Sequence, residues 1–303
     1  MLRLKIWRVP GIVNIVEVSD PEEIKALAKE SGIDRDFNLR TCPINWFLLR
    51  RSLSVLSFAG RRFPTVTRHD SEQRRTEQER LSKRLSEKAQ FVRTGPEELE
   101  PLARWVKGLG STDEVGILAQ QLLGRLFSSG FVASQESWDA AQVLVAAPRS
   151  WKPKILWWFL SGKVRRSKRL LAQMVDDDLS GLNAIGIAVH NLVKGMRQMR
   201  VLYADANIRS NLTPGAVARQ CLFAPISLYR QAKAEVRLGD HCFPRNSLFV
   251  LEIGKASRQE GGLPLVFMEE TWSRCPGAQW VSATLEGLWR RAAASTPVAG
   301  PVS

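Results

Sequence analysis

The sequence predicts a mainly α-helical fold with a small β region. Long stretches of helix-forming residues with few glycines or prolines make up most of its 303 residues. A short alternating segment precedes them, and a second β segment, with a turn at Gly239-Asp240, interrupts them late in the chain. Because 44% of the residues are hydrophobic, the chain can bury a sizeable core. We expect a single domain over residues 1–303, with residues 1–10 and 295–303 disordered.

The chain is expected to open with a strand followed by a helix. Residues 11–18, GIVNIVEV, alternate as a strand does, and SDPEEIKALAKES follows. Ser19 is a suitable N-cap, and Pro21 fits the first helical turn. Glu22 and Glu23 would complement the positive end of the helix dipole.

Further helices are predicted along the rest of the chain. Their expected ranges are 69–92, 115–129, 137–147, 176–199, 213–223 and the segment GAQWVSATLEGLWRRAAA that follows Cys275. The helix over 176–199 has an acidic first turn and a centre that is apolar nearly all round, which is typical of a buried helix. Residues 235–253 are predicted to form a strand, a turn and a second strand.

Charge and cysteine usage restrict the classes of function. Lys and Arg number 44 against 30 Asp and Glu, a net charge of +14 that favours polyanions, anionic membrane surfaces or acidic cofactors. The four cysteines show no CxxC spacing, so we expect neither a zinc ribbon nor a disulfide framework. No signal peptide is evident, and a reducing, cytoplasmic location is expected. We expect no nucleic-acid partner, because the charges are dispersed and no zinc-finger, homeodomain or RNA-recognition pattern occurs.

Residues 151–169, WKPKILWWFLSGKVRRSKR, join three tryptophans to an apolar patch and seven basic residues. Tryptophan prefers a membrane interface and Lys or Arg prefers anionic headgroups. The segment therefore suits peripheral docking on a membrane that holds a lipid substrate. A partly buried helix with a solvated basic end explains it equally well. Its apolar run, residues 155–160, is too short to span a bilayer.

Cys275 has a setting that suits a ligand. Pro276 fits the first position of a helix that begins directly after the cysteine, and Gly277 allows a flat group to approach the backbone. Amides at a helix start favour an anionic sulfur, and a thiolate placed there can ligate haem iron. The alternative is a buried, inert thiol. Cys42, Cys221 and Cys242 have no such setting, and we expect them in the core.

Several segments in order resemble the cytochrome P-450 family. RCPGAQWVSATLE resembles its cysteine-ligand loop and the following helix, and FAPISLYRQA resembles its proline-containing turn with a propionate-binding arginine, here Arg230. HDSEQRR resembles the helix whose His and Arg bind propionates, which points to His69 and Arg74, with Arg75 beside them on the same helix. VEVSDPEEIKALA and DHCFPRNSLFVLEIGKASRQ resemble its first strand and helix and its later strand pair. The resemblance implies a shortened cytochrome P-450-like fold with haem b as cofactor and Cys275 as the metal ligand.

The sequence also departs from the family pattern. The Glu of its E-x-x-R pair is absent, since AVARQCLFAP holds Arg219 without an acidic partner. The F-x-x-G before the cysteine is replaced by MEET. The chain is shorter than a typical member, chiefly in the helices that cover the substrate pocket. These losses favour, among the alternatives, a relative without haem that binds partner proteins.

The central helix indicates which reaction such a protein would perform. LNAIGIAVHN, residues 182–191, lacks the acid–alcohol pair of haem monooxygenases and offers Asn183 three residues before Gly186. N-x-x-G resembles the branch of the family that rearranges fatty-acid hydroperoxides, in which Asn183 would orient the substrate oxygen and Gly186 would let a ligand lie against the backbone. Equally, Asn183 could bridge helices and Gly186 could allow close packing. His190, about two turns on, suits an interior histidine better than a haem-side role.

We therefore expect a haem-thiolate enzyme that rearranges a lipid hydroperoxide without dioxygen or a reductase. Asn183 and Gly186 are the candidate catalytic residues. Haem would be bound by residues Cys275, Gly277, Arg230, His69 and Arg74. Two alternatives remain open: a monooxygenase or peroxygenase with an atypical proton relay, and a haem-less homologue that acts as a partner-binding protein.

Overall fold

The computed structural model describes residues 4–9, 13–69, 71–148 and 152–294. Two compact units make up the chain. Unit 1 comprises Met1–Glu79, Ala147–Phe159 and Ala224–Cys275, and unit 2 comprises Arg80–Ala146, Leu160–Phe223 and Pro276–Ser303. The chain passes back and forth between them, so no single cut in the sequence separates the two. The expectation of a single domain stays a prediction.

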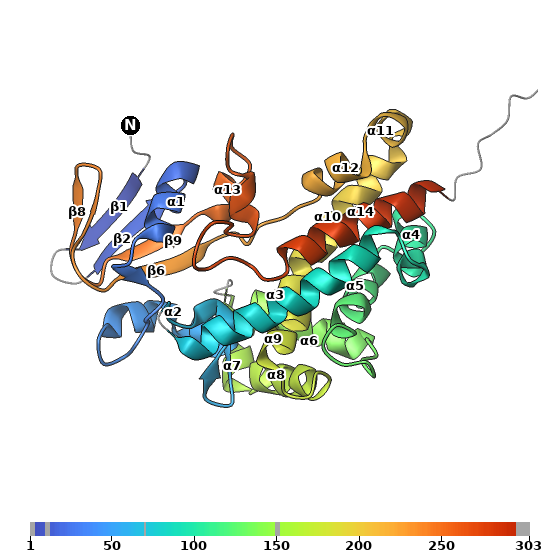
Figure 1. The fold of residues 1–303 in the computed structure, drawn as a ribbon. Helices are drawn as coiled ribbons and strands as arrows, with labels where there is room; N and C mark the ends of the chain where they lie inside the picture. The colour runs from blue at the N-terminus through green and yellow to red at the C-terminus, as the bar shows by residue number, and fades with distance from the viewer. Residues whose placement is uncertain (1–3, 10–12, 70, 149–151, 295–303) are drawn as a thin grey trace, which may run out of the picture. The chain divides into compact units, whose positions relative to one another are not determined.

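Unit 1 is built on a five-stranded mixed sheet (Figure 1). Its strand order is β1 (Leu4–Val9), β2 (Val13–Val18), β9 (Leu248–Leu251), β6 (Leu228–Ala232) and β3 (Ile33–Asp34). Only β2 and β9 pair in parallel; the other neighbours are antiparallel. The predicted first strand is confirmed as β2. Leu4–Val9 form a paired strand rather than a disordered terminus, and residues 1–3, 10 and 295–303 lie outside the described residues.

The helix after β2 is confirmed as α1 (Pro21–Lys29), but its cap is Asp20 and not Ser19. The Asp20 carboxylate accepts the backbone N–H groups of Glu22 and Glu23. An aspartate in that position satisfies two of the free N–H groups at the helix start and adds a favourable charge. Ser19, one residue earlier, is buried.

The predicted strand, turn and strand over 235–253 are present with one break. β7 (Val236–Leu238) and β8 (His241–Phe243) form a hairpin around Gly239-Asp240. The chain then turns at Asn246, whose φ is 69°, before β9 enters the main sheet. The same unit holds α2 (Pro43–Val55), the β4 (Ser57–Phe58) and β5 (Arg61–Arg62) hairpin, α13 (Ile253–Ala256) and nearly all of α7 (Pro153–Leu160).

The charged helix predicted over 69–92 is α3 (Glu72–Arg93), which runs from unit 1 into unit 2. His69 lies before its first residue, so His69 does not share a helix with Arg74 and Arg75. The backbone N–H of His69 instead donates to the side chain of Asp34, which holds this residue in the preceding turn.

Unit 2 is helical (Figure 1). Its helices are α4 (Glu100–Val106), α5 (Glu114–Gly124), α6 (Gln135–Ala146), α8 (Lys163–Gln173), α9 (Leu179–Asn183), the π-helical turn η3 (Ala184–Ala188), α10 (Val189–Ala204), α11 (Ala206–Asn211), α12 (Pro214–Gln220) and α14 (Ala278–Ala294). Trp280, Leu288 and Trp289 of α14 are fully buried and form part of its core. The helix predicted to reach residue 129 ends earlier, at Gly124. None of the described helices is long and apolar enough to cross a membrane.

The long helix predicted over 176–199 is confirmed as α9, η3 and α10 in succession. It begins at Leu179 rather than residue 176, because Asp176 and Asp177 adopt left-handed backbone conformations. Asp178 then caps α9 by accepting the N–H groups of Ser180 and Gly181. The acidic residues that were expected in the first turn of the helix therefore lie in the turn before it.

Gly195 offers a test of how closely the helices of unit 2 approach. A Cβ atom there would lie 2.3 Å from the carbonyl oxygen of Cys221, whereas one at Gly130 would meet nothing within 4 Å. We expect Gly195→Ala to lower the free energy of unfolding by about 1–3 kcal/mol, because the backbone after α12 must shift. Urea denaturation checks this, with Gly130→Ala as the control. Equal effects of the two changes would contradict the close approach.

Candidate functional site

Three buried arginines of unit 1 surround the ring of Trp272. Arg35 follows β3, Arg74 lies in the first turn of α3, and Arg230 lies in β6. Their guanidinium carbons lie 4.7, 4.6 and 5.3 Å from the centre of the Trp272 ring. Their exposed fractions are 4%, 6% and 1%. Arginine is rarely buried to this extent unless a partner compensates its charge.

Hydrogen bonds within the unit use only some of the guanidinium donors. Arg74 Nη2 donates to the carbonyl oxygen of Trp272 at 2.7 Å. Arg230 donates to the hydroxyl of Ser273 at 3.0 Å and to the backbone carbonyl of the preceding residue, Tyr229, at 2.7 Å. All of these acceptors are neutral, so they do not balance the charge of the arginines.

The Nε atoms of Arg35, Arg74 and Arg230 are buried and have no hydrogen-bond partner among the described residues. A buried donor without an acceptor costs free energy, more so in a charged group. Burial and then repulsion from Arg74 lower the pKa of Arg230 to about 9. Burial and repulsion from Arg230 and Arg74 hold the pKa of Arg35 well below its usual range. The cluster therefore favours an anionic ligand with several acceptor oxygens.

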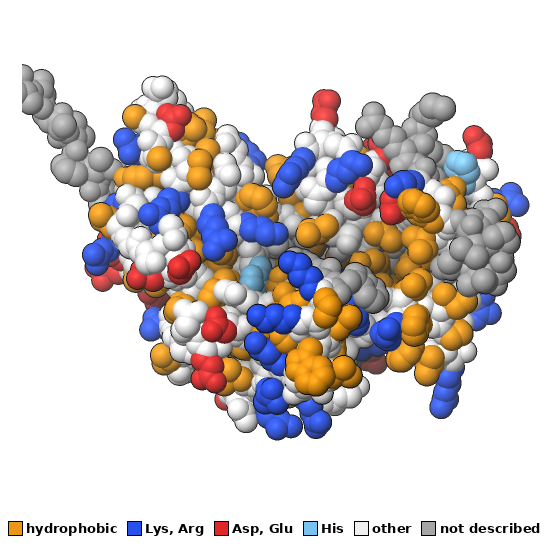
Figure 2. All heavy atoms as spheres, turned by 180° about the vertical axis from the view of Figure 1, so that it is seen from behind, with side chains coloured by type: hydrophobic (Ala, Val, Ile, Leu, Met, Phe, Trp, Pro, Cys, Tyr) orange, Lys and Arg blue, Asp and Glu red, His pale blue; other side chains and the backbone are white. Residues whose placement is uncertain are grey.

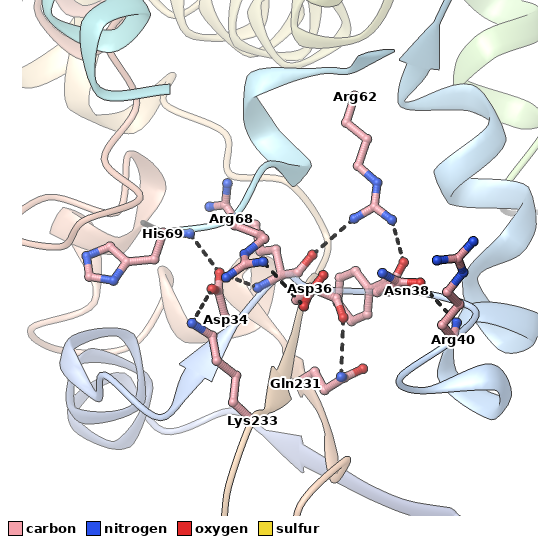
Figure 3. A network of polar contacts seen from close by, with 11 residues as sticks. Asp34, Asp36, Asn38, Arg40, Arg62, Arg68, His69, Gln231 and Lys233 are labelled. Atoms are coloured by element: carbon pink, nitrogen blue, oxygen red, sulfur yellow. Dashed lines mark hydrogen bonds and ion pairs between the residues drawn. The ribbon is translucent and has the colours of Figure 1, made fainter. Parts of the chain in front are cut away.

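Asp34 is the acidic group of this cluster, and it is fully buried (Figure 3). Lys233 Nζ lies 2.8 Å from its carboxylate, and the backbone N–H groups of Arg35 and His69 donate to it at 2.7 and 2.8 Å. Burial alone would raise the pKa of Asp34, but these hydrogen bonds, first that of Lys233, lower it. One carboxylate thus faces the three arginines and a lysine, which leaves a positive excess.

Side chains also fix the backbone that carries Arg35 (Figure 3). Arg62 donates to the carbonyl oxygens of Arg35 and Phe37, and Gln231 of β6 donates to that of Asp36 at 3.3 Å. Because the segment is held from two sides, Arg35 enters the cluster from a defined backbone position.

The predicted propionate ligands largely come together here. His69 tilts its ring against Trp272, with 4.9 Å between ring centres, and Arg74 and Arg230 bind the same segment. Sequence reasoning missed Arg35, because an arginine between two aspartates is also typical of a solvated surface. Its position directly after a short strand that pairs with β6 is a property of the tertiary structure.

Cys275 lies at the end of a loop that hydrogen bonds hold in shape. Its backbone N–H donates to the carbonyl oxygen of Phe267 at 2.7 Å, and the Thr271 hydroxyl donates to that of Met268 at 2.8 Å. Met268 and Glu270 adopt left-handed conformations, with φ of 53° and 61°. Such conformations are costly for residues with side chains, so the loop is held in place by its contacts.

The four cysteines differ in their surroundings. Cys42 and Cys221 are buried, and burial raises the pKa of both thiols, that of Cys221 to about 12. Cys275 is exposed, in contrast to the alternative of a buried, inert thiol. Cys242, expected in the core, is also exposed, because it lies on the β7–β8 hairpin, where a hydrogen bond with Glu235 raises its pKa.

The helix after Cys275 begins later than the sequence predicted. Pro276 and Gly277 form a turn, and α14 begins at Ala278. The carbonyl oxygen of Gly277 accepts the N–H of Val281, so Gly277 precedes the helix as its first acceptor. Proline is therefore outside the helix and not at its first position.

Asn183 and Gly186 belong to unit 2. Asn183, the last residue of α9, is half-buried, and its side-chain amide has no hydrogen-bond partner among the described residues. A Cβ atom at Gly186 would lie 3.0 Å from Leu144 and 3.3 Å from Leu171. Gly186 thus lets α6 and α8 approach the helix closely, and a substrate-orienting role for Asn183 stays a prediction.

A π-helical turn follows Asn183 and contains Gly186. The N–H of Val189 donates to the carbonyl of Ala184, five residues back, rather than to that of Ile185. The Ile185 carbonyl accepts instead from Gln120 Nε2 of α5 at 3.1 Å, and Gln120 is also bound to Ser137. Such π turns often occur at functional sites.

His190 has an interior partner. Its ring stacks on that of Trp138 of α6, with 4.7 Å between centres and 29° between planes. This contact agrees with the expectation of an interior histidine. Within the described residues, no three His, Cys, Asp or Glu side chains are grouped to hold a metal ion.

Comparison with known proteins gives a clear answer at the level of the fold. No family model and no curated protein matches the sequence. Among solved structures, cytochrome P450EX alpha with myristic acid matches with a TM-score of 0.66 and 13% identity, over 95% of this chain and 82% of that one. A cytochrome P450 from Thermus thermophilus matches with a TM-score of 0.60 and 14% identity, over 91% of this chain and 84% of that one. The P450 monooxygenase TamI, bound to tirandamycin C, matches with a TM-score of 0.60 and 16% identity, over 94% of this chain and 85% of that one.

The chain therefore has the cytochrome P450 fold, in a shortened form. The resemblance of short segments to this family, and the mainly α-helical architecture with a small β region, are confirmed.

The arginine cluster allows a test of its electrostatics. Arg35 makes one long hydrogen bond, 3.4 Å to the Pro64 carbonyl, so Arg35→Met removes repulsion at little cost in hydrogen bonding. We expect the haem-free protein in low salt to keep or increase its free energy of unfolding. Urea denaturation measures it. The control, Arg62→Met, removes two hydrogen bonds to the backbone that carries Arg35 but none of the three guanidinium groups around Trp272, and it should destabilise by about 1–3 kcal/mol. A similar loss for both changes would contradict the repulsion.

Proposed function

We propose that the chain is a haem-thiolate enzyme of the cytochrome P450 type that rearranges lipid hydroperoxides. The observation that carries the haem assignment is the group of three buried arginines whose Nε atoms have no partner. Haem b carries two propionate carboxylates, and guanidinium groups pair with carboxylates through charge-assisted hydrogen bonds. The residues present therefore fit this group.

Each residue has a distinct role in holding the cofactor. Arg35, Arg74 and Arg230 would neutralise the propionates, and the Trp272 ring contacts all three guanidinium groups. Cys275 would supply the thiolate from an exposed position on its loop. Haem, when bound through a thiolate, supplies an iron that favours cleavage of O–O bonds.

The type of reaction follows from the long helix of unit 2. Residues 179–204 contain neither Asp nor Glu and no threonine, so they offer no acid–alcohol pair to deliver protons. A hydroperoxide already contains its O–O bond and needs no such delivery. Asn183 can hydrogen-bond one substrate oxygen, and an amide among apolar neighbours orients a ligand well. Gly186 supports this function indirectly, by letting the helices close around that segment.

A lipid is the substrate class that we favour. Asn183 has apolar neighbours in the chain, such as Leu182 and Ile185, and apolar side chains suit an acyl chain. One structure with this fold, cytochrome P450EX alpha, holds myristic acid. We also propose that residues 151–169 dock on a membrane, because Lys163, Arg165, Arg166 and Arg169 are exposed on α8.

Two other functions remain as alternatives. A monooxygenase or peroxygenase would need dioxygen with an electron donor, or peroxide, and a proton relay other than an acid–alcohol pair. A haem-less partner-binding protein would follow from the missing E-x-x-R glutamate. The buried arginines favour a bound dianion and so argue against this last alternative.

The thiolate assignment predicts a specific spectrum. The protein purified with haem should show a thiolate-type Soret band when reduced and exposed to carbon monoxide. We expect Cys275→Ala to abolish that band, because no other described cysteine lies in the loop before α14. The variants Cys42→Ala, Cys221→Ala and Cys242→Ala should keep it. An unchanged band in the Cys275 variant would rule out this ligand.

The reaction assignment predicts turnover without a reductase. The haem-loaded protein should consume a polyunsaturated fatty-acid hydroperoxide in the absence of reduced nicotinamide. Asn183→Leu should slow this reaction by about tenfold or more or change its product, while the Soret band persists, because one oriented hydrogen bond is lost. Chromatography measures the loss of the substrate and identifies the product.

The controls separate the alternatives. Asn191→Leu changes an amide on the same long helix and should leave the reaction unchanged. Turnover that requires dioxygen and an electron donor would support a monooxygenase instead. Absence of both haem and hydroperoxide consumption would support the partner-binding protein.

A further inference from the structure

Helix α2 of unit 1 turns an apolar stripe toward solvent. Ile44, Phe47 and Leu48 are 37%, 55% and 46% exposed. Their spacing, i, i+3 and i+4, places them on one face of the helix. A stripe of large apolar side chains on the outer face of a helix indicates a surface that meets something other than water.

The opposite face of α2 is fixed to the unit, so the stripe cannot turn inward. Asn45 is buried and donates to the Gln231 side chain at 3.0 Å and to the Asn246 carbonyl at 2.8 Å. Leu49 and Leu53 join a buried cluster of unit 1. The helix therefore has two apolar faces, and only one of them is covered.

The chain segment that carries the stripe has charges of a single sign. Residues 37–63 contain five arginines and no acidic residue. These arginines are Arg40, Arg50, Arg51, Arg61 and Arg62. The guanidinium of Arg50 lies 3.7 Å from the centre of the Phe47 ring, so a positive charge sits directly beside the apolar stripe. Such a surface complements a partner whose outer layer is negatively charged and whose deeper layer is apolar.

Helix α7 contacts α2 within the same unit. Arg51 donates to the carbonyl of Ala147 and lies 5.4 Å from the Phe159 ring, which joins α2 to the segment that carries α7. Trp157 of α7 is exposed, and residues 152–160 contain no acidic residue. Figure 2 shows hydrophobic and basic side chains side by side on the face seen there.

We propose that the stripe of α2 inserts into the headgroup region of an anionic lipid bilayer. Helices that lie in a membrane interface combine bulky apolar residues on one face with Lys or Arg beside them, and this is the arrangement of α2. Tryptophan, here Trp157, prefers the same depth. This inference names residues outside the 151–169 segment as the principal contact, and it depends on neither haem nor the reaction.

The test is binding of the full chain to vesicles. Phosphatidylcholine vesicles with phosphatidylserine should bind the protein, and vesicles of phosphatidylcholine alone should bind it much more weakly. The triple change Ile44→Ser, Phe47→Ser and Leu48→Ser should weaken co-sedimentation with the anionic vesicles by about tenfold or more, since three apolar side chains lose their burial. Circular dichroism checks that the variant is folded.

Matched variants isolate the stripe. Leu109→Ser with Val132→Ser removes two exposed apolar residues of unit 2 and should leave binding unchanged. Arg40→Gln with Arg61→Gln removes two exposed charges of unit 1, and binding should weaken and depend less on salt. Neither pair lies in the proposed cofactor or substrate site.

Three outcomes would overturn the proposal. The triple variant could bind anionic vesicles as tightly as the original protein. Binding could respond to Arg165→Glu with Arg166→Glu and not to the α2 changes, which would place the contact on α8. Sedimentation without lipid could show a dimer that the triple variant loses, which would make the stripe an interface between two copies of the chain.

Discussion

Burial of three guanidinium groups around one tryptophan is the constraint on which the candidate site depends. Arg35, Arg74 and Arg230 each come from a different part of the chain, yet all face Trp272 within about the same distance. Burial lowers the pKa values of all three, repulsion between the arginines lowers those of Arg35 and Arg230 further, and Asp34 compensates only one charge. The folded unit thus carries an electrostatic cost that a ligand with two carboxylates would relieve, and this makes haem a physically reasonable cofactor.

The surroundings of the cluster show how the unit tolerates this cost. Asp34 receives hydrogen bonds from two backbone N–H groups and an ion pair from Lys233, so it holds the segments of Arg35 and His69 together. The loop before Cys275 keeps its shape through its own hydrogen bonds, although Met268 and Glu270 occupy conformations that glycine adopts more easily. The departure of MEET from the family pattern therefore does not prevent a defined loop.

In unit 2 the central helix becomes irregular directly after Asn183, the residue that we propose to orient the substrate. The π turn after Asn183 frees the carbonyl of Ile185, and Gln120 supplies the missing donor. Gly186 removes the side chain that would keep α6 and α8 away. Together these contacts hold the helix in an irregular form at the position where Asn183 presents its amide.

The sequence by itself determined the elements that depend on local patterns: strand β2 and helix α1, the charged helix, the long apolar helix and the β7–β8 hairpin. It missed strand β1. It also indicated Cys275, Arg230, His69 and Arg74, whose segments resemble a known family in order. It could not identify Arg35, the exposure of Cys242, the start of α14 or the choice of Asp20 over Ser19 as a cap. The surroundings of Arg35 and Cys242 were decided by the tertiary structure, because burial and charge repulsion depend on residues far apart in the chain. The cap and the start of α14 depend on local backbone geometry, which residue types alone do not fix.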